Sequence, residues 1–235
     1  MALDLDHICA RAGGFEVTAD FSVPAGARVA IIGASGSGKS TLLDVIAGFR
    51  APMSGEVRWQ GVPLTDKPPA ERPIGILFQD TNLFPNLTIQ QNLALALNPV
   101  SGRLKAGAAD KIDAVLSRVG LDGFGPRRLS EMSGGQQSRA ALARVLVQAR
   151  PVLLLDEPFS ALGPALRDEM LDLVRDVAEA EGTTVLLVTH NPQEALRFAR
   201  HTIVVEAGCA APPRDTQALL DDPPPELRRY LGAGS

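Results

Sequence analysis

The fold of this chain is decided by nine consecutive residues, which are Gly33, Ala34, Ser35, Gly36, Ser37, Gly38, Lys39, Ser40 and Thr41. They follow an apolar run at 29–32 that is typical of a buried strand, and they precede a segment at 42–47 with helical composition. Their spacing fits G-x-x-x-x-G-K-[ST], and the strand–loop–helix context that this pattern requires is present. The alternative is a chance glycine-rich turn. The flanking segments favour a phosphate-binding loop.

The residue types in this loop suit the phosphates of a nucleotide. Glycines let successive backbone N–H groups converge on one point, where they can donate to phosphate oxygens. The helix that begins near Lys39 adds the positive end of its dipole at the same point. In such loops the lysine reaches the β- and γ-phosphates, and the hydroxyl in the position of Ser40 completes a Mg²⁺ shell. The sequence therefore predicts nucleotide and Mg²⁺ binding.

The overall composition is that of an ordinary globular protein. The chain has 235 residues, of which 45% are hydrophobic and 21% charged, with a formal net charge of −4. This slightly acidic balance argues against a nucleic-acid partner, which requires a basic excess. The first six residues are acidic and lack a signal-peptide pattern, and no uncharged stretch approaches the roughly 18–20 residues of a membrane span. Cys9 and Cys209 lack metal-site spacing, so we expect a cytoplasmic protein.

Strand and helix patterns alternate on both sides of the loop. Alternation and apolar runs predict strands at 2–10, 15–23, 27–32, 74–78, 152–155, 184–188 and 202–205, and a small hairpin over 56–64. Helical spacing predicts helices after the loop up to residue 48, from 87 onward, and at 110–119, 134–149, 164–180 and 192–199. The proline-rich segment 67–73 is expected to be a surface connection, 98–107 a loop, and the tail beyond 208 to hold one or two short helices at most.

This order of elements predicts an α/β fold. The sheet is expected to be mostly parallel, with crossover helices and a small antiparallel β part near the N-terminus. Residues 87–150 form an all-helical insertion in this scheme. The chain is then one domain, in which 1–86 and 151–235 make the core.

A second candidate site element follows the apolar run at 152–155, where the chain continues with Asp156 and Glu157. Parallel strands buried on both faces have this composition, and α/β sheets bind ligands at the carboxyl ends of such strands. Asp156 is placed to hold the Mg²⁺ shell, and Glu157 to polarise the water that attacks the γ-phosphate. The alternative is a strand that ends in an acidic turn, which the phosphate loop makes less attractive.

Two further segments carry candidate chemistry. Ser133, Gly134, Gly135 and Gln136 open a predicted helix, with Ser133 as its N-cap. Two glycines at a helix N-terminus are either a second phosphate cradle or only a flexible cap. Because one set of carboxylates accompanies two cradles, sharing between two copies of the chain is indicated. His190 follows the predicted strand at 184–189, where it could bond a γ-phosphate or be an ordinary satisfied polar group.

Together these segments resemble the ATP-binding subunits of ABC transporters, over essentially the whole chain. Residues 33–40 resemble the Walker A motif and 152–156 the Walker B motif, while Gln79 matches the Q-loop, 133–137 the signature motif and His190 the switch histidine. The resemblance implies a P-loop NTPase core of the ABC ATPase type. It also implies that Glu157, His190 and Lys39 act in ATP hydrolysis, and that Gln79 joins Ser40 and Asp156 around Mg²⁺.

The same resemblance implies a head-to-tail homodimer in which each ATP lies between one copy's Walker A loop and the other copy's signature segment. This sequence departs from the family at Met132, where leucine is usual, and at Gly163, where the family has an aspartate. An aromatic residue that stacks on adenine is not obvious in the sequence. Phe15 is the nearest candidate, beside Ala12 and Arg11.

Within the family, a chain without membrane spans resembles the ATPase subunits of bacterial importers, which are separate polypeptides from the permease. The segment 79–88 resembles the form that this segment takes in importers, where its groove receives a helix of a transmembrane permease. Leu83 and Phe84 are expected to be partly exposed in this segment. They could instead pack beneath the helical insertion. Residues 93–99 and 159–170 resemble the ATPases of thiamine importers most. The ATPases of iron(III), sulfate, molybdate and polyamine importers share much of the same sequence.

The importer resemblance implies a peripheral protein at the cytoplasmic face of the inner membrane. Its expected partners are a second copy, permease subunits and, indirectly, a periplasmic substrate-binding protein. The competing classes are a non-transport ABC ATPase, disfavoured because the chain lacks coiled-coil arms and basic extensions, and a nucleotide-binding scaffold. Glu157 and His190 disfavour the scaffold.

Overall fold

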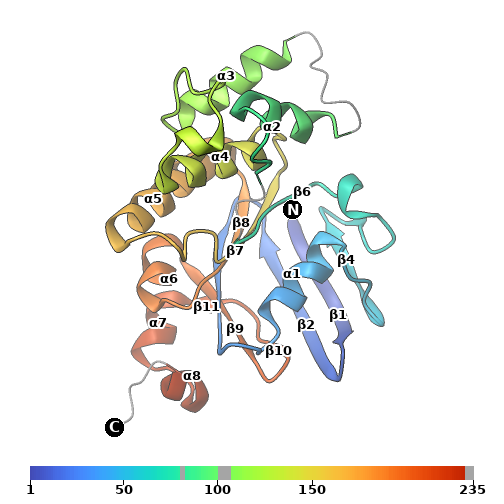
Figure 1. Ribbon diagram of the computed structural model, residues 1–235. Coiled ribbons are helices and arrows are strands. Elements are labelled where there is room, and N and C mark those ends of the chain that lie inside the picture. The colour runs from blue at the N-terminus through green and yellow to red at the C-terminus, as the bar shows by residue number, and fades with distance from the viewer. Residues whose placement is uncertain (80–82, 100–106, 231–235) are drawn as a thin grey trace.

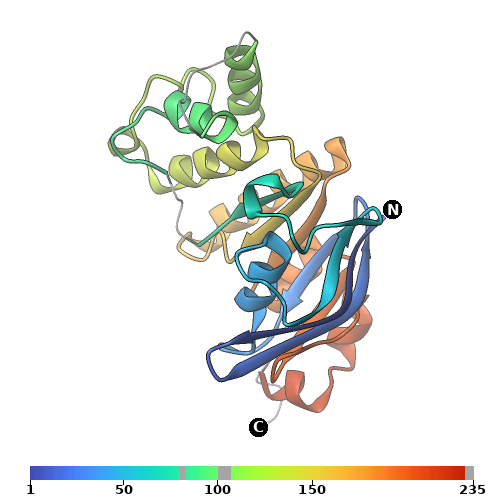
Figure 2. The ribbon, with the colours of Figure 1, turned by 90° about the vertical axis from the view of Figure 1, so that its right-hand side faces the viewer.

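The computed structural model describes residues 1–79, 83–99 and 107–230, and these residues form one long sheet with helices packed on it (Figures 1 and 2). The sheet has eleven strands in the order β5-β4-β1-β2-β10-β9-β3-β8-β7-β6, and β11 pairs with β9 beside this path. Both views place α2, α3 and α4 together at one end of the molecule, beyond the strands. This is the predicted α/β architecture.

The parallel part of the sheet carries the candidate site. Its strands are β6 (Ile74–Leu77), β7 (Val152–Asp156), β8 (Thr184–Val188), β3 (Arg28–Ile32) and β9 (His201–Glu206). Neighbours along this order pair in parallel, so their carboxyl ends meet at one edge. The five predicted apolar runs therefore agree with the structure to within about two residues at each end, the usual uncertainty of boundaries.

The antiparallel part contains the strands nearest the N-terminus. It consists of β1 (Ala2–Ala12), β2 (Phe15–Pro24), β4 (Ser54–Trp59) and β5 (Val62–Pro63). Buried and exposed residues alternate along β2, as one-sided packing requires. Two short strands that the sequence analysis missed, β10 (Cys209–Ala210) and β11 (Arg214–Asp215), pair with β9, and β10 also pairs with β2. Two residues are too few to show a period.

The helices cover the sheet and build the end beyond it. They are α1 (Lys39–Ala47), α2 (Ile89–Leu97), α3 (Ala108–Arg118), α4 (Gly134–Leu146), α5 (Pro164–Glu181), α6 (Pro192–Phe198), α7 (Thr216–Asp221) and α8 (Pro225–Tyr230). Two short 3-10 turns, Pro69–Glu71 and Leu129–Glu131, complete the elements. The tail holds two short helices, as expected. Most of the loop expected at 98–107 lies outside the described residues. No helix in the described chain has the length and apolarity to cross a membrane.

The buried side chains form two hydrophobic clusters, one on each face of the sheet. Alternate residues of β3 divide between them, because Ala30 and Ile32 belong to one cluster and Val29 and Ile31 to the other. The first cluster continues into α2, α3 and α4. The second fills the space around α1 and the antiparallel strands. The strand that leads into the phosphate loop is thus held from both sides.

The segment 67–73 is a surface connection, as expected, except at one residue. The other six residues are exposed or half-buried, whereas the side chain of Arg72 is only 1% exposed. Its guanidinium donates to the carbonyls of Val45 and Ile46, each at 2.8 Å, and to those of Thr65 and Lys67 at 3.0 and 2.9 Å. The last carbonyls of a helix lack intrahelical partners, and Arg72 supplies donors to the end of α1. We call this arrangement the Arg72 cluster.

Candidate nucleotide site

A cleft of about 200 Å³ at the carboxyl edge of the parallel strands brings nine of the predicted site residues together. Its lining comes from the start of β2, the phosphate loop and the residues that follow β7 and β8. The lining residues are Phe15, Ser35, Gly36, Gly38, Lys39, Ser40, Thr41, Glu157 and His190. Four stretches that are far apart in the sequence thus meet at one place.

The phosphate loop needs glycine at its two ends. Gly33 has a φ of 155°, and a Cβ there would lie 2.1 Å from the carbonyl oxygen of Val205. Gly38 has a φ of 109°, and a Cβ there would lie 2.7 Å from Val17 and 3.0 Å from Phe15. Any side chain at either position would therefore push the loop out of place. The loop is a cradle of bare backbone, which is the form that binds phosphate.

Lys39 is buried within this cradle. Its ammonium group donates to the carbonyl oxygens of Gly33 and Ala34, both at 2.8 Å, so it lies under the curve of the loop. Burial lowers the pKa of Lys39, while the charges of Glu157 and Asp156 oppose that shift. The nearby hydroxyl of Ser37 is buried and has no partner within the described chain. A buried cation and an unpartnered hydroxyl in one loop fit a bound triphosphate.

Asp156 and Ser40 form the candidate metal pair. Asp156 ends β7, and its carboxylate accepts a hydrogen bond from the Ser40 hydroxyl. Burial raises the pKa of Asp156, and the nearby carboxylates of Glu157 and Asp44 raise it further. A carboxylate that is desolvated and repelled by its neighbours gains from a divalent cation, and hard oxygen donors are the ligands that Mg²⁺ prefers. These residues fit a Mg²⁺ ion.

Glu157 lies one residue beyond and has an unusual backbone. Its φ of 49° is in the left-handed region that non-glycine residues rarely adopt. Its N–H donates to the carbonyl of Val188 at 3.2 Å, which ties the turn to the end of β8. His190 follows that strand, and its Nε2 lies 2.5 Å from Oε1 of Glu157. Such strain is typical of positions where geometry serves function.

The remaining predicted residues lie elsewhere in the single chain. Within the described residues, neither Gln79 nor the segment 133–136 lines the cleft. Ser133 is the N-cap of α4, as predicted, and forms a capping box with Gln136. Gly135 packs against α5, since a Cβ there would lie 2.7 Å from Leu166. The structure of one copy therefore holds one cradle in the cleft and the other outside it.

The importer-like segment gives a mixed result. Residues 80–82 lie outside the described residues. The exposure expected for Phe84 is present, at 47%, and the Arg144 guanidinium lies 5.2 Å from the centre of its ring. The expectation for Leu83 was wrong, because this side chain is buried in the cluster that includes α2 and α4. Packing beneath the helices, the alternative, applies to Leu83 alone.

Sequence analysis missed several polar residues behind the cleft. Arg167, Thr189 and Glu194 are joined by hydrogen bonds immediately beside Glu157 and His190. Each lies at ordinary helical or strand-end spacing, and none was given a role in the site, although Arg167 lies within the importer-like segment 159–170. The one available signal was the position of Glu194 four residues after His190.

Comparison with known proteins agrees with this geometry. The family described as ABC transporter matches residues 18–160. A protein of Cereibacter sphaeroides named thiamine import ATP-binding protein ThiQ is 55% identical over 230 residues, covering 98% of this chain and 99% of that protein. Proteins of the same name from Ruegeria sp. and Mesorhizobium japonicum are 51% and 47% identical, each over 98% of this chain and 100% and 91% of their own length.

Solved structures show the same fold. The ADP conformation of MJ1267, an ATP-binding cassette of an ABC transporter, has a TM-score of 0.88 at 26% identity and covers 99% of both chains. The dimeric post-hydrolysis state of the cassette MJ0796, bound to ADP and Pi, has a TM-score of 0.74 at 28% identity and covers 91% of this chain and 98% of that one. With its phosphate loop, paired carboxylates and His190 in one cleft, the chain belongs to the ABC transporter family, as one of its ATP-binding proteins.

Proposed function

We propose that this chain is the ATP-hydrolysing subunit of a bacterial thiamine importer. The observation that carries the ATPase assignment is the contact of Glu157 with His190 in the same cleft as the phosphate loop. The thiamine assignment is supported by relatives at 47–55% identity over nearly the full chain, all named for thiamine import. ATP is the substrate in this proposal.

Each cleft residue then has a chemical role. The backbone N–H groups of the phosphate loop and the Lys39 ammonium hold the triphosphate and balance its charge. Ser40 and Asp156, joined by Gln79, would hold Mg²⁺, and the ion would supply electrophilic stabilisation of the charge on the phosphates. Glu157 accepts the proton of the attacking water. His190 holds the Glu157 carboxylate in place and donates toward the γ-phosphate.

A second copy of the chain completes the site. The segment 133–136 lies at the N-terminus of a 13-residue helix and outside the cleft of its own chain. A head-to-tail dimer brings this segment onto the triphosphate held by the partner, so that each ATP is bound from two sides. Relatives whose structures are described as dimeric share the fold. The division into a core of 1–86 and 151–235 and a helical part of 87–150 gives each subunit both halves of the arrangement.

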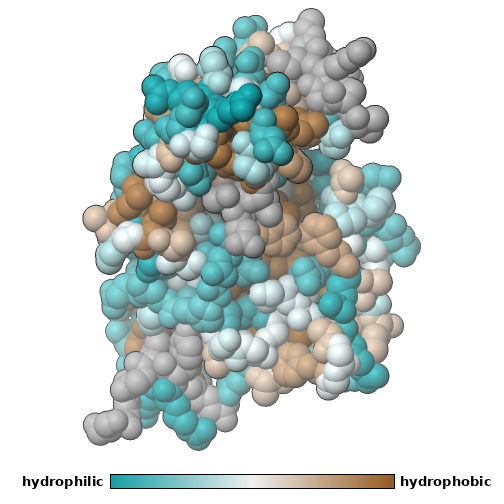
Figure 3. Space-filling view, in the orientation of Figure 1, coloured by the Kyte–Doolittle hydropathy of each residue, from teal (hydrophilic) through white to brown (hydrophobic). Residues whose placement is uncertain are grey.

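The permease is proposed to dock where the helical part meets the sheet. A groove of about 260 Å³ lies between β6 and α4, and Phe49, Phe78 and Arg144 are among its lining residues. Phe49 is 56% exposed, and apolar surface gathers where the helices meet the sheet (Figure 3). Exposed aromatic side chains around a groove suit an apolar helix from a partner. The chain then lies peripherally at the cytoplasmic face of the membrane, and a periplasmic binding protein acts on it only through the permease.

The assignment is tested by uptake in cells that lack the chain. Deletion should abolish uptake of labelled thiamine while iron and sulfate uptake persist, and the parent gene should restore it. A gene carrying Glu157→Gln should fail to restore uptake, because the purified variant should bind MgATP but hydrolyse it about 100-fold more slowly, the scale of general-base removal. Near-normal hydrolysis by Glu157→Gln would contradict its role. Loss of iron or sulfate uptake instead would assign the chain to a sister importer.

The docking surface is tested separately in detergent-solubilised membranes. Phe84 does not line the groove but lies beside Arg144, which does. Phe84→Ser should weaken capture of the permease by about tenfold, since an aromatic anchor at an interface contributes roughly 1–2 kcal/mol. Val62→Ser is the matched control, because Val62 is 51% exposed on the edge strand β5. Equal capture by both variants would move the permease contact away from Phe84.

A further inference from the structure

Behind the Glu157–His190 contact lies a second cavity, of about 260 Å³, with polar residues along its wall. Glu157 and His190 line both this cavity and the nucleotide cleft. Arg167, from the first turn of α5, and Glu194, from α6, also line it. These two residues therefore lie beside the catalytic pair, on the side away from the nucleotide cleft.

Arg167 binds the loop that follows Glu157. Its Nε donates to the carbonyl of Phe159 at 3.2 Å, and its Nη2 donates to the carbonyls of Ser160 and Leu162 at 3.0 and 2.9 Å. The loop is also held by the buried side chain of Phe159 and by a hydrogen bond from the N–H of Leu162 to the carbonyl of Phe159. At its end Gly163 is the N-cap of α5 without a side-chain cap bond. One guanidinium thus holds most of the loop's backbone.

The same guanidinium reaches the segment of His190 through two side chains. Nη1 of Arg167 donates to Oε1 of Glu194 at 3.1 Å. The other oxygen of Glu194 accepts from the hydroxyl of Thr189, the residue before His190. That hydroxyl in turn accepts from the N–H of Asn191 at 3.0 Å, on the other side of His190. The residues on both sides of His190, Thr189 and Asn191, are therefore connected by hydrogen bonds to Arg167 through Glu194.

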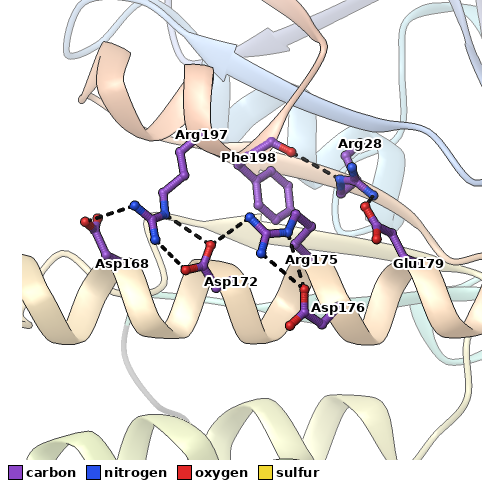
Figure 4. A network of polar contacts seen from close by, with 8 residues as sticks. All are labelled: Arg28, Asp168, Asp172, Arg175, Asp176, Glu179, Arg197 and Phe198. Atoms are coloured by element: carbon purple, nitrogen blue, oxygen red, sulfur yellow. Dashed lines mark hydrogen bonds and ion pairs between the residues drawn. The ribbon is translucent and has the colours of Figure 1, made fainter.

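The burial of Glu194 distinguishes this pair from the neighbouring ion pairs. The side chains of Arg167 and Glu194 are 25% and 12% exposed. Arg197, one turn further along α6, pairs with Asp168 and Asp172 of α5, and Arg28 reaches Glu179 and the carbonyl of Phe198 (Figure 4). The Arg197 side chain is 41% exposed, and exposed ion pairs contribute little. The outer pairs hold α6 on α5 but touch neither the loop nor Thr189.

We propose that Arg167, acting through Glu194 and Thr189, is a positioning residue that sets Glu157 against His190 for ATP hydrolysis. This inference rests on the proposed ATPase function. Removing the guanidinium takes the donor from the carbonyls of Ser160 and Leu162, weakens the hold on that of Phe159, and leaves the Glu194 carboxylate without its cation in a partly buried site. The loop and the His190 segment then move independently, and the Glu157–His190 geometry is populated less often. Nucleotide binding is spared, because Arg167 does not line the cleft.

The test is a double-mutant cycle on the purified full-length chain. Arg167→Gln and Thr189→Val each remove one end of the chain of contacts, and they have no direct hydrogen bond to one another. Each should lower kcat about tenfold, the scale of misplacing a catalytic group without removing it. The double variant should lose no more than the worse single variant, because both act through one connection. The affinity for ATP, measured by equilibrium binding, should change by less than about twofold.

Two controls separate positioning from simple destabilisation. Arg197→Gln removes the outer ion pairs of the same helices, and its kcat should stay within about twofold of the parent. Thr189→Ser restores the hydroxyl and should turn over roughly tenfold faster than Thr189→Val.

The outcomes distinguish this inference from the function on which it rests. Additive losses in the double variant, or a loss of affinity without a loss of kcat, would overturn the positioning role. An equal loss of kcat in Arg197→Gln would show that the two helices act only as a rigid support. Failure of the parent chain to hydrolyse ATP would instead refute the proposed function.

Discussion

Two arginines in this protein make nearly the same contacts in two different regions. Arg72, beside the end of α1, donates to four backbone carbonyls, and Arg167, beside Glu157, donates to three. Arg72 forms no ion pair within the described residues, whereas Arg167 continues through Glu194 to Thr189. In the described part of the chain the guanidinium of Arg72 donates only to main-chain carbonyls, whereas the contacts of Arg167 continue to Thr189, the residue before His190. Equivalent hydrogen bonds can thus support stability in one region and turnover in the other.

The largest expected effect is on stability, at the Arg72 cluster. Arg72→Met keeps the apolar stem but removes a donor from four carbonyls, of which that of Val45 still accepts from the N–H of Gly48. We expect the free energy of unfolding to fall by about 3 kcal/mol. For a chain of this size the melting temperature should fall by roughly 5–10 °C. Turnover per folded molecule and ATP affinity should stay the same, because Arg72 does not line the cleft.

The control for this variant is Arg58→Met, since Arg58 lies on the sheet surface and forms only exposed ion pairs. Its melting temperature should stay within about 2 °C of the parent. A slower turnover of Arg72→Met at unchanged stability would reverse the comparison between the two arginines.

An intermediate effect is expected at Asp156, because its buried charge lowers the stability of the folded protein. Burial raises the pKa of this carboxyl in the folded state, so the folded chain takes up its proton at a higher pH than the unfolded chain does. At neutral pH the buried charge is a cost, and Asp156→Asn should stabilise the nucleotide-free and Mg²⁺-free protein by about 1 kcal/mol. As the pH falls through the raised folded pKa toward the unfolded value near 3.8, the parent gains its proton and the difference should vanish.

Denaturant unfolding at pH 7 and near pH 4 measures this difference. The same variant should bind MgATP more weakly than the parent, because it loses a charged metal ligand. An Asp156→Asn chain that is less stable than the parent at pH 7 would show that the carboxylate is compensated by its hydrogen bond from Ser40.

The smallest effect is expected at Gly163, in the loop that Arg167 holds. Gly163 has the extended backbone of an N-cap, and a Cβ there would meet nothing within 4 Å. Gly163→Asp should therefore fit and cap α5, raising stability by only a few tenths of a kcal/mol. A carboxylate at this position should also strengthen communication between the two ATP sites of the proposed dimer. The denaturant midpoint and the Hill coefficient for ATP are the readouts. No change in either would mean that the Arg167 contacts alone are enough to hold the loop and that a carboxylate at position 163 adds nothing.

The phosphate loop was predictable because its backbone requires particular residues. Only glycine fits at positions 33 and 38, so the spacing of these two glycines predicts the conformation of the phosphate loop directly. The meeting of Glu157 and His190 was predictable for a different reason. Each follows a run of buried residues, and runs of this kind form adjacent parallel strands, β7 and β8, that end at one edge.

Arg72 and Arg167 could not be predicted in the same way. Their partners are main-chain carbonyls, which every residue carries, so the partner positions leave no pattern in the sequence. Leu83 and Phe84 show a related limit. Both are apolar and adjacent, and only the placement of the helices decides that the first is buried and the second is exposed. Contacts that depend on the packing of distant elements need the structure itself.

The place of β3 in the sheet sets a condition on how the protein is synthesised. This strand leads into the phosphate loop, yet its two neighbours are β8 and β9, near the other end of the chain. A nascent chain on the ribosome therefore carries the loop residues long before the strands that hold them have been translated. Pairings of such long sequence separation form late in folding. A polypeptide released early, before residues 184–206, has the entire ATP-binding motif and no folded site in which to use it.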